Sequence, residues 1–179
     1  MSYQALFGAF PIASEGSCLD PKPNSLVGDL RGSSRNGAFF RGLRDLLNAL
    51  PSHEALRFFA DEASYPDRQR SDETQWTILD EKSILQVIAA LDSLLRACHE
   101  NATVVANAEF FKDQGLTAEQ IPSYLAVAKE CSDVAVETPS GEDGDSPEFL
   151  FAALVSLRAL LRRAQAHSER IAIFTWSPR

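Results

Sequence analysis

The stretch SPEFLFAALVSLRALLRRAQAH, residues 146–167, decides the fold because it carries the clearest helix signals in the chain. Ser146 is a suitable N-cap, and Pro147 suits the first helical position, where no backbone N–H is needed. Leucines recur at spacings of four, three and four residues, which places them on one helix face: Leu150, Leu154, Leu157 and Leu161. We therefore predict a core helix here, with Arg158 and Arg162 on another side.

Helical spacing recurs in several other stretches of the chain. Thr117 and Gln120 match a capping box, in which two side chains satisfy backbone N–H groups of the first turn. Residues 101–111 are ambiguous, because Thr-Val-Val favours a strand and the Ala-rich remainder favours a helix. We interpret them as a helix that Gly115 ends. Helices are therefore expected over about 38–50, 53–63, 80–99, 101–111 and 117–131.

The segment IAIFTW at 171–176 is the best strand in the chain, because it is rich in β-branched and aromatic residues. Its expected partner is Trp76–Leu79 or the apolar N-terminal arm at 3–13. The pattern predicts a mainly α (α+β) class, a bundle of five to six helices with a small sheet that involves 171–176. A chain of 179 residues is most simply one domain. We therefore expect a single globular domain over 1–179, with loops at 14–37, 64–75 and 137–146.

The composition is that of an ordinary globular protein, with 45% hydrophobic and 23% charged residues. The net charge of −8 argues against nucleic acid or an anionic membrane as the main partner, since both are polyanions. No apolar stretch reaches the length of a membrane-spanning helix, and the first residues lack the basic region of a signal peptide. The three cysteines show no motif spacing. These features predict a cytoplasmic protein without a disulfide framework.

Sequence motifs for catalysis or metal binding do not occur in the chain. No Ser, Thr or Cys stands in a nucleophile elbow or a Cys-His signature, and His53, His99 and His167 are isolated from one another. The acidic run at 142–145 is shorter than an EF-hand calcium loop and lacks its terminal Glu. We therefore expect no metal and no cofactor. Members of a catalytic triad need not be neighbours in sequence, so an enzyme stays open, although the pattern favours a non-enzymatic role.

A protein-binding role fits the small size and acidic charge of the chain. We interpret it as a binding module, of the kind that an inhibitor or immunity protein represents in toxin neutralisation. Toxins that act on nucleic acids or nucleotides tend to be basic at the active site, so acidic loops would complement and occlude such a partner. The expected contact segments are 61–73 and 137–148. Their candidate partner-binding residues are Asp61, Glu62, Asp67, Asp72, Glu73, Glu142, Asp143 and Asp145.

The alternative is an unrecognised enzyme, or a helical protein that binds a small anion. The Gly-rich stretch 28–37 precedes a predicted helix, where backbone N–H groups and the helix dipole favour an anion. It matches neither the Walker spacing nor GxGxxG, and a turn before a helix also explains its glycines. The anion-binding candidates in the 28–44 stretch are Arg35, Arg41 and Arg44, with Trp76 as a further pocket residue.

Overall fold

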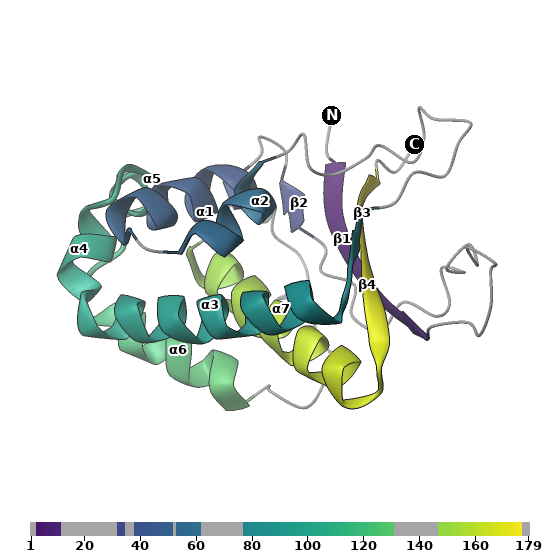
Figure 1. The fold of residues 1–179 in the computed structure, drawn as a ribbon. Helices are drawn as coiled ribbons and strands as arrows, with labels where there is room; N and C mark the ends of the chain where they lie inside the picture. The colour runs from purple at the N-terminus through teal and green to yellow at the C-terminus, as the bar shows by residue number, and fades with distance from the viewer. Residues whose placement is uncertain are drawn as a thin grey trace.

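Helices dominate the structure, which confirms the mainly helical class. Figure 1 shows the helices gathered on one side of the molecule and the strands on the other. No helix in the described part of the chain is both long enough and apolar enough to cross a membrane. The computed structural model describes residues 3–11, 32–34, 38–51, 53–61, 77–130 and 147–176.

The described part of the chain begins with two strands and ends with one, and a further strand separates a first group of helices from a second. The helices are α1 (Ala38–Ala49), the 3-10 helix η2 (Glu54–Leu56), α2 (Arg57–Ala60), α3 (Glu81–Glu100), α4 (Ala102–Asn107), α5 (Glu109–Asp113), α6 (Gln120–Glu130) and α7 (Pro147–Ala166). The strands are β1 (Tyr3–Pro11), β2 (Gly32–Ser34), β3 (Thr77–Leu79) and β4 (Glu169–Trp176). β2 lies inside the stretch 14–37, where a loop was expected.

The strands pair in the order β2-β1-β4-β3, so segments far apart in sequence lie side by side. β4 runs antiparallel to both of its neighbours. The register pairs Gln4 with Trp176 and Pro11 with Glu169 between β1 and β4, and Thr77 with Ile173 and Leu79 with Ile171 between β3 and β4. α3 follows β3 directly, and α7 leads into β4 through a two-residue turn. The strands therefore fix one end of each of the two longest helices.

The centre of the hydrophobic core lies between α3 and α7, which are 20 residues long each and contact one another. The predicted leucine face of α7 is buried, together with Phe151 and Val155 beside it. α3 begins at the predicted cap, where Asp80 Oδ1 accepts the N–H of Ser83 at 2.8 Å. Its buried face consists of Ile84, Val87, Ile88, Leu91, Leu94, Leu95 and Cys98. The apolar stripes predicted for both helices are confirmed as core.

Aromatic rings join α5 to α7 and bring it close to α1. The ring of Phe111 stacks on that of Phe151, with centroids 5.8 Å apart and an interplanar angle of 18°. On the other side, Phe110 approaches Gly42 so closely that a Cβ at Gly42 would lie 2.8 Å from ring carbon Cε1. The N–H of Phe110 donates to Asp45 Oδ2 at 3.0 Å, which satisfies an otherwise unpaired donor of the first turn of α5. The close approach therefore depends on glycine in α1.

Two predicted helices are shorter or interrupted in the structure. The helix expected over 53–63 begins as a 3-10 turn and ends at Ala60, because the backbone of Asp61 is extended (φ −101°, ψ 112°). The single helix expected over 101–111 is broken at Ala108, which is also extended (φ −65°, ψ 142°). Residues five apart lie about 140° apart around a straight α-helix. The break is what allows Val105 and Phe110 to be buried together.

The helix expected from Thr117 starts three residues later, as α6 at Gln120. The N–H of Thr117 donates to Gln120 Oε1 at 2.8 Å, which is one half of the predicted capping box. Gly115, predicted to end the preceding helix, has a left-handed backbone with φ of 69°. Its N–H donates to the carbonyl of Lys112 at 3.0 Å. One half of the predicted capping box and the predicted helix end at Gly115 are therefore observed. The helix itself begins at Gln120, the last residue of the capping box, and not at Thr117.

His53 is buried just before η2, and its Nδ1 has no hydrogen-bond partner. Burial lowers the pKa of this imidazole below its ordinary value, because the charged form loses its hydration. The other two histidines are exposed: His99 in the last turn of α3 and His167 in the turn after α7. Of the three histidines, His53 alone is therefore buried.

We expect Leu157→Ala to lower the free energy of unfolding by about 2–5 kcal/mol, because it removes buried methyl groups and leaves a cavity. The matched control is Leu85→Ala, which removes the same atoms from a side chain that is 45% exposed. The control should change stability by less than about 0.5 kcal/mol. Chemical denaturation followed by circular dichroism measures both. Equal losses in the two variants would contradict the burial of the α7 stripe.

We expect acidification to destabilise the protein partly through His53. Its folded-state pKa lies below the unfolded value, so the unfolded chain takes up a proton first as the pH falls. The stability that neutral His53 contributes is complete above the unfolded pKa of about 6.5 and is lost as the pH falls below it. Stability measured from neutral pH to pH 5 should therefore fall less steeply in His53→Leu than in wild type. His99→Gln, at an exposed histidine, should keep the wild-type slope, and an identical slope in His53→Leu would refute this role.

Candidate functional site

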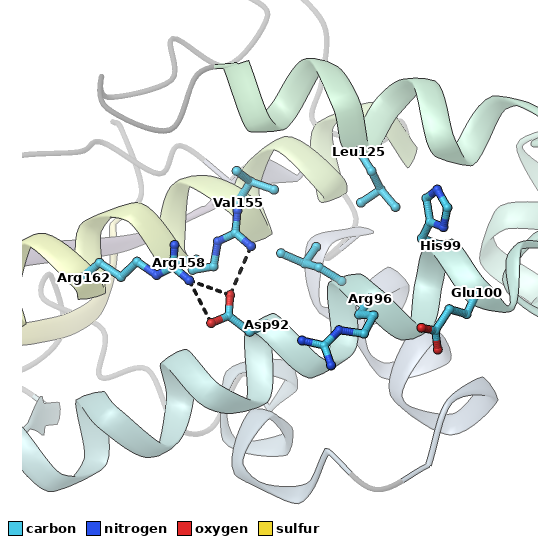
Figure 2. A pocket seen from close by; sticks show the side chains of 9 residues that line it. Asp92, Arg96, His99, Glu100, Leu125, Val155, Arg158 and Arg162 are labelled. Carbon is cyan, nitrogen blue, oxygen red and sulfur yellow. Dashed lines mark hydrogen bonds and ion pairs between the residues drawn. The ribbon is translucent and has the colours of Figure 1, made fainter.

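The described part of the chain contains a cleft of about 450 Å³ where α3, α6 and α7 meet (Figure 2). Its lining combines charged side chains with an apolar surface made by Leu95, Leu125 and Val155. Five lining residues come from α3, one from α6 and three from α7. The charged or titratable ones are Asp92, Arg96, His99, Glu100, Arg158 and Arg162. The cleft is therefore built on rigid helices.

The position of the cleft follows from the helical repeat of α3. Asp92, Arg96, His99 and Glu100 are separated by four, three and one residues, so they share one side of the helix. Leu95 lies among these residues in the sequence and is buried, so their side of α3 borders the apolar face of the helix. The polar edge of α3 thus lies where α7 crosses it. The charged residues therefore form a row along α3, between the side that packs in the core and the side that faces solvent.

One carboxylate holds two guanidinium groups across the cleft, as Figure 2 shows. Nη2 of Arg162 donates to both oxygens of Asp92, at 2.8 and 2.9 Å. Nη1 of Arg158 donates to Asp92 Oδ1 at 3.2 Å. The Arg158 side chain is only 13% exposed, against 32% for Asp92 and 53% for Arg162. The group carries two positive charges and one negative charge, so it keeps a net positive charge at the edge of the core.

The other charged groups of the cleft have no partners among the described side chains. No hydrogen bond or ion pair joins Arg96, His99 or Glu100 to another side chain in that part of the protein. Arg96 adds a second unbalanced positive charge near Asp92, and Glu100 places a carboxylate near the opposite end in Figure 2. The cleft therefore has a positive end and an acidic end, joined by apolar side chains.

The chemistry that this lining offers is ion pairing, hydrogen bonding and apolar contact. The described residues contain no group of three His, Cys, Asp or Glu side chains that could hold a metal ion. Cys98, which lies close by in sequence, is fully buried on α3. Burial raises the pKa of its thiol to about 12, so it is protonated at neutral pH. Cys98 is thus a core residue.

Most of the acidic residues predicted to contact a partner lie outside the described residues. Asp61 is the exception: it is exposed and directly follows α2. The remaining predicted residues lie outside the described residues: Glu62, Asp67, Asp72, Glu73, Glu142, Asp143 and Asp145.

The arginines of the anion-binding alternative lie away from the cleft or outside the described residues. Arg35 belongs to the latter group. Arg41 and Arg44 are exposed on α1 and do not line the cleft. The Arg41 guanidinium carbon lies 5.5 Å from the ring centre of Phe110, a cation–π distance that holds this side chain against α5. Anion binding by the 28–44 stretch stays a prediction.

The sequence pointed to the arginines of the cleft but not to the cleft itself. Arg158 and Arg162, which the sequence places on another side of the predicted helix, form ion pairs with Asp92 in the structure. Asp92 was not identified as their partner, because the sequence of neither helix determines the register in which α3 packs against α7. The one feature of the sequence that could have indicated this partner is that Asp92 is an acidic residue at the edge of the apolar stripe of α3.

Comparison of the chain with protein-family models, curated proteins and solved structures gave no match.

We expect Asp92→Ala to lower the free energy of unfolding by about 1–3 kcal/mol, because it leaves the poorly exposed Arg158 guanidinium without its partner. The control is Asp113→Ala at the exposed end of α5, which should change stability by less than about 0.5 kcal/mol. Denaturation at low and high salt measures both, and the Asp92 effect should persist at high salt because partly buried pairs are weakly screened. Equal stability of the two variants would contradict a structural role for the ion pairs.

Proposed function

We propose that the protein is an acidic binding module that engages and occludes a partner protein with a basic surface, as an inhibitor or immunity protein does. The supporting observation is the position of its charge. Segment 61–73 has five acidic and two basic residues, and segment 137–148 has five acidic and none basic. Their net charges of −3 and −5 together equal the −8 of the whole chain. All other residues balance one another.

Such concentrated charge has a physical consequence for association. Charge that is spread evenly over a surface chiefly keeps a protein soluble. Charge gathered in two short segments creates a local negative potential, which steers a basic partner and selects against acidic surfaces. An enzyme that binds nucleic acid or nucleotides needs positive groups at its active site. Two acidic segments can compete with the natural substrate for these groups.

The described residues at the edges of the segments support an interface that is separate from the core. Asp61 is exposed at the end of α2, and Glu148 is exposed in the first turn of α7. Pro147 beside it is buried. Each segment thus adjoins a helix that buried side chains hold in the core.

The first experiment identifies the partner. The full chain serves as bait in a cytoplasmic extract of its native host, and retained proteins are identified by mass. Two further baits run in parallel. One carries Lys at Glu142, Asp143 and Asp145, and the other carries Lys at the exposed positions Glu81, Glu109 and Asp113. A specific partner is retained by wild type and by the second variant, and is lost from the first.

Reversal of Glu142, Asp143 and Asp145 to Lys should slow association with the purified partner sharply. The local charge changes by six units, from −3 to +3, which turns attraction of a basic surface into repulsion. Folding stability should move by no more than about 0.5 kcal/mol per surface site. The difference in association rate should shrink in concentrated salt, where the Debye length falls to about 3 Å. Stopped-flow or surface-based kinetics at two salt concentrations measures both effects.

The control is the reversal of Glu81, Glu109 and Asp113, which changes the total charge by the same amount outside the two segments. It should leave the association rate close to that of wild type. The reversal of the 61–73 acids, Asp61, Glu62, Asp67, Asp72 and Glu73, is made separately. Unchanged association at low salt in both segment variants, or equal slowing in the control, would show that the segments do not form the interface.

A further inference from the structure

We propose that the cleft between α3, α6 and α7 is a binding site for a small organic acid with one carboxylate and an apolar body. This inference is independent of the acidic segments and of any protein partner. It rests on the side chains that line the cleft, which offer a positive end, an apolar middle and an acidic far end (Figure 2). Each of these three features selects one property of the ligand.

The positive end selects an anionic head group. A guanidinium carries five N–H donors, and Arg158 uses one nitrogen, Nη1, on Asp92. Asp92 balances only one of the two arginines that it contacts. Arg96 lies one helical turn from Asp92 on α3 and has no partner among the described side chains. Two positive charges in excess therefore remain at this end.

The charge of the cleft favours a carboxylate over a phosphate. Guanidinium groups pair with carboxylates and with phosphates, so the number of negative charges on the ligand decides between them. A phosphate monoester carries nearly two negative charges at neutral pH. Asp92 stands in the wall beside the place where this group would lie, so a second ligand charge would meet its repulsion. A single negative charge is balanced without that cost.

The middle and the far end of the cleft select an apolar body without a second acid group. Leu95, Leu125 and Val155 present buried apolar side chains to the space. The volume of about 450 Å³ lies within the usual range for small-molecule sites. Glu100 is eight residues from Asp92, or about 12 Å along the helix axis, so it would repel a second carboxylate there. A dicarboxylate of this length is therefore excluded.

The test uses four probes and the full chain. Octanoate combines one carboxylate with an apolar body; 1-octanol lacks the charge; octanedioate adds a second carboxylate; inorganic phosphate lacks the body. Backbone amide signals in an NMR titration report where each probe binds and how tightly. Octanoate should shift signals of α3 and α7 around the cleft with a dissociation constant on the order of 1 mM or tighter. The other three probes should bind there at least about tenfold more weakly.

Two matched variants locate the carboxylate. Arg96→Gln removes one positive charge from the cleft without breaking an ion pair, so the fold should be kept. Arg44→Gln removes the same charge from an exposed site on α1. Octanoate affinity should fall about tenfold in the first variant and stay unchanged in the second. Melting curves of both variants confirm that folding is not the cause.

Several results would overturn the proposal. The first is the absence of saturable octanoate shifts at the cleft across the millimolar range. The second is equal or tighter binding of 1-octanol, octanedioate or phosphate at the same residues. The third is an unchanged octanoate affinity in Arg96→Gln, or an equal loss in Arg44→Gln, which would indicate unspecific charge attraction. None of these results depends on whether the acidic segments bind a protein.

Discussion

The packing of α3 against α7 is the constraint on which the rest of the described structure depends. Both helices bury a continuous apolar stripe, and side chains such as Leu91 and Leu154 are almost without exposure. The remaining helices cover what these two leave open, and both long helices contact the strands. Burial of so much apolar surface is the largest favourable term in folding. The relative register of α3 and α7 therefore decides which polar residues meet at their edges.

The meeting of those edges produces the cleft between α3, α6 and α7. Asp92 comes from α3, whereas Arg158 and Arg162 come from α7, so the ion pairs record the register of the two helices. The result is a small positive site in a protein whose net charge is −8. The acidic charge that dominates the chain lies in two other segments. The attraction of a basic surface and the binding of a small acid that we propose would therefore use separate parts of the sequence.

Close packing elsewhere places limits on how the helical part can change. Gly42 leaves no room for a Cβ beside Phe110, and the ring of Phe111 stacks on Phe151. These contacts couple α1, α5 and α7, so a displacement of one is transmitted to the others. Buried His53 adds a group whose neutral state the fold requires. The packing of the core thus depends on the shapes of its side chains as well as on their hydrophobicity.

The sequence by itself determined the mainly helical class, the apolar stripes of α3 and α7 and several capping residues. These features are local: the helical repeat and the first-turn hydrogen bonds depend on residues within about four positions of one another. Only the tertiary structure decided the break at Ala108, which lets Val105 and Phe110 be buried together, and the pairing of Asp92 with Arg158 and Arg162. Ion-pair partners that lie 66 and 70 residues apart are chosen by how two helices cross, and that crossing is set by the fit of their buried side chains.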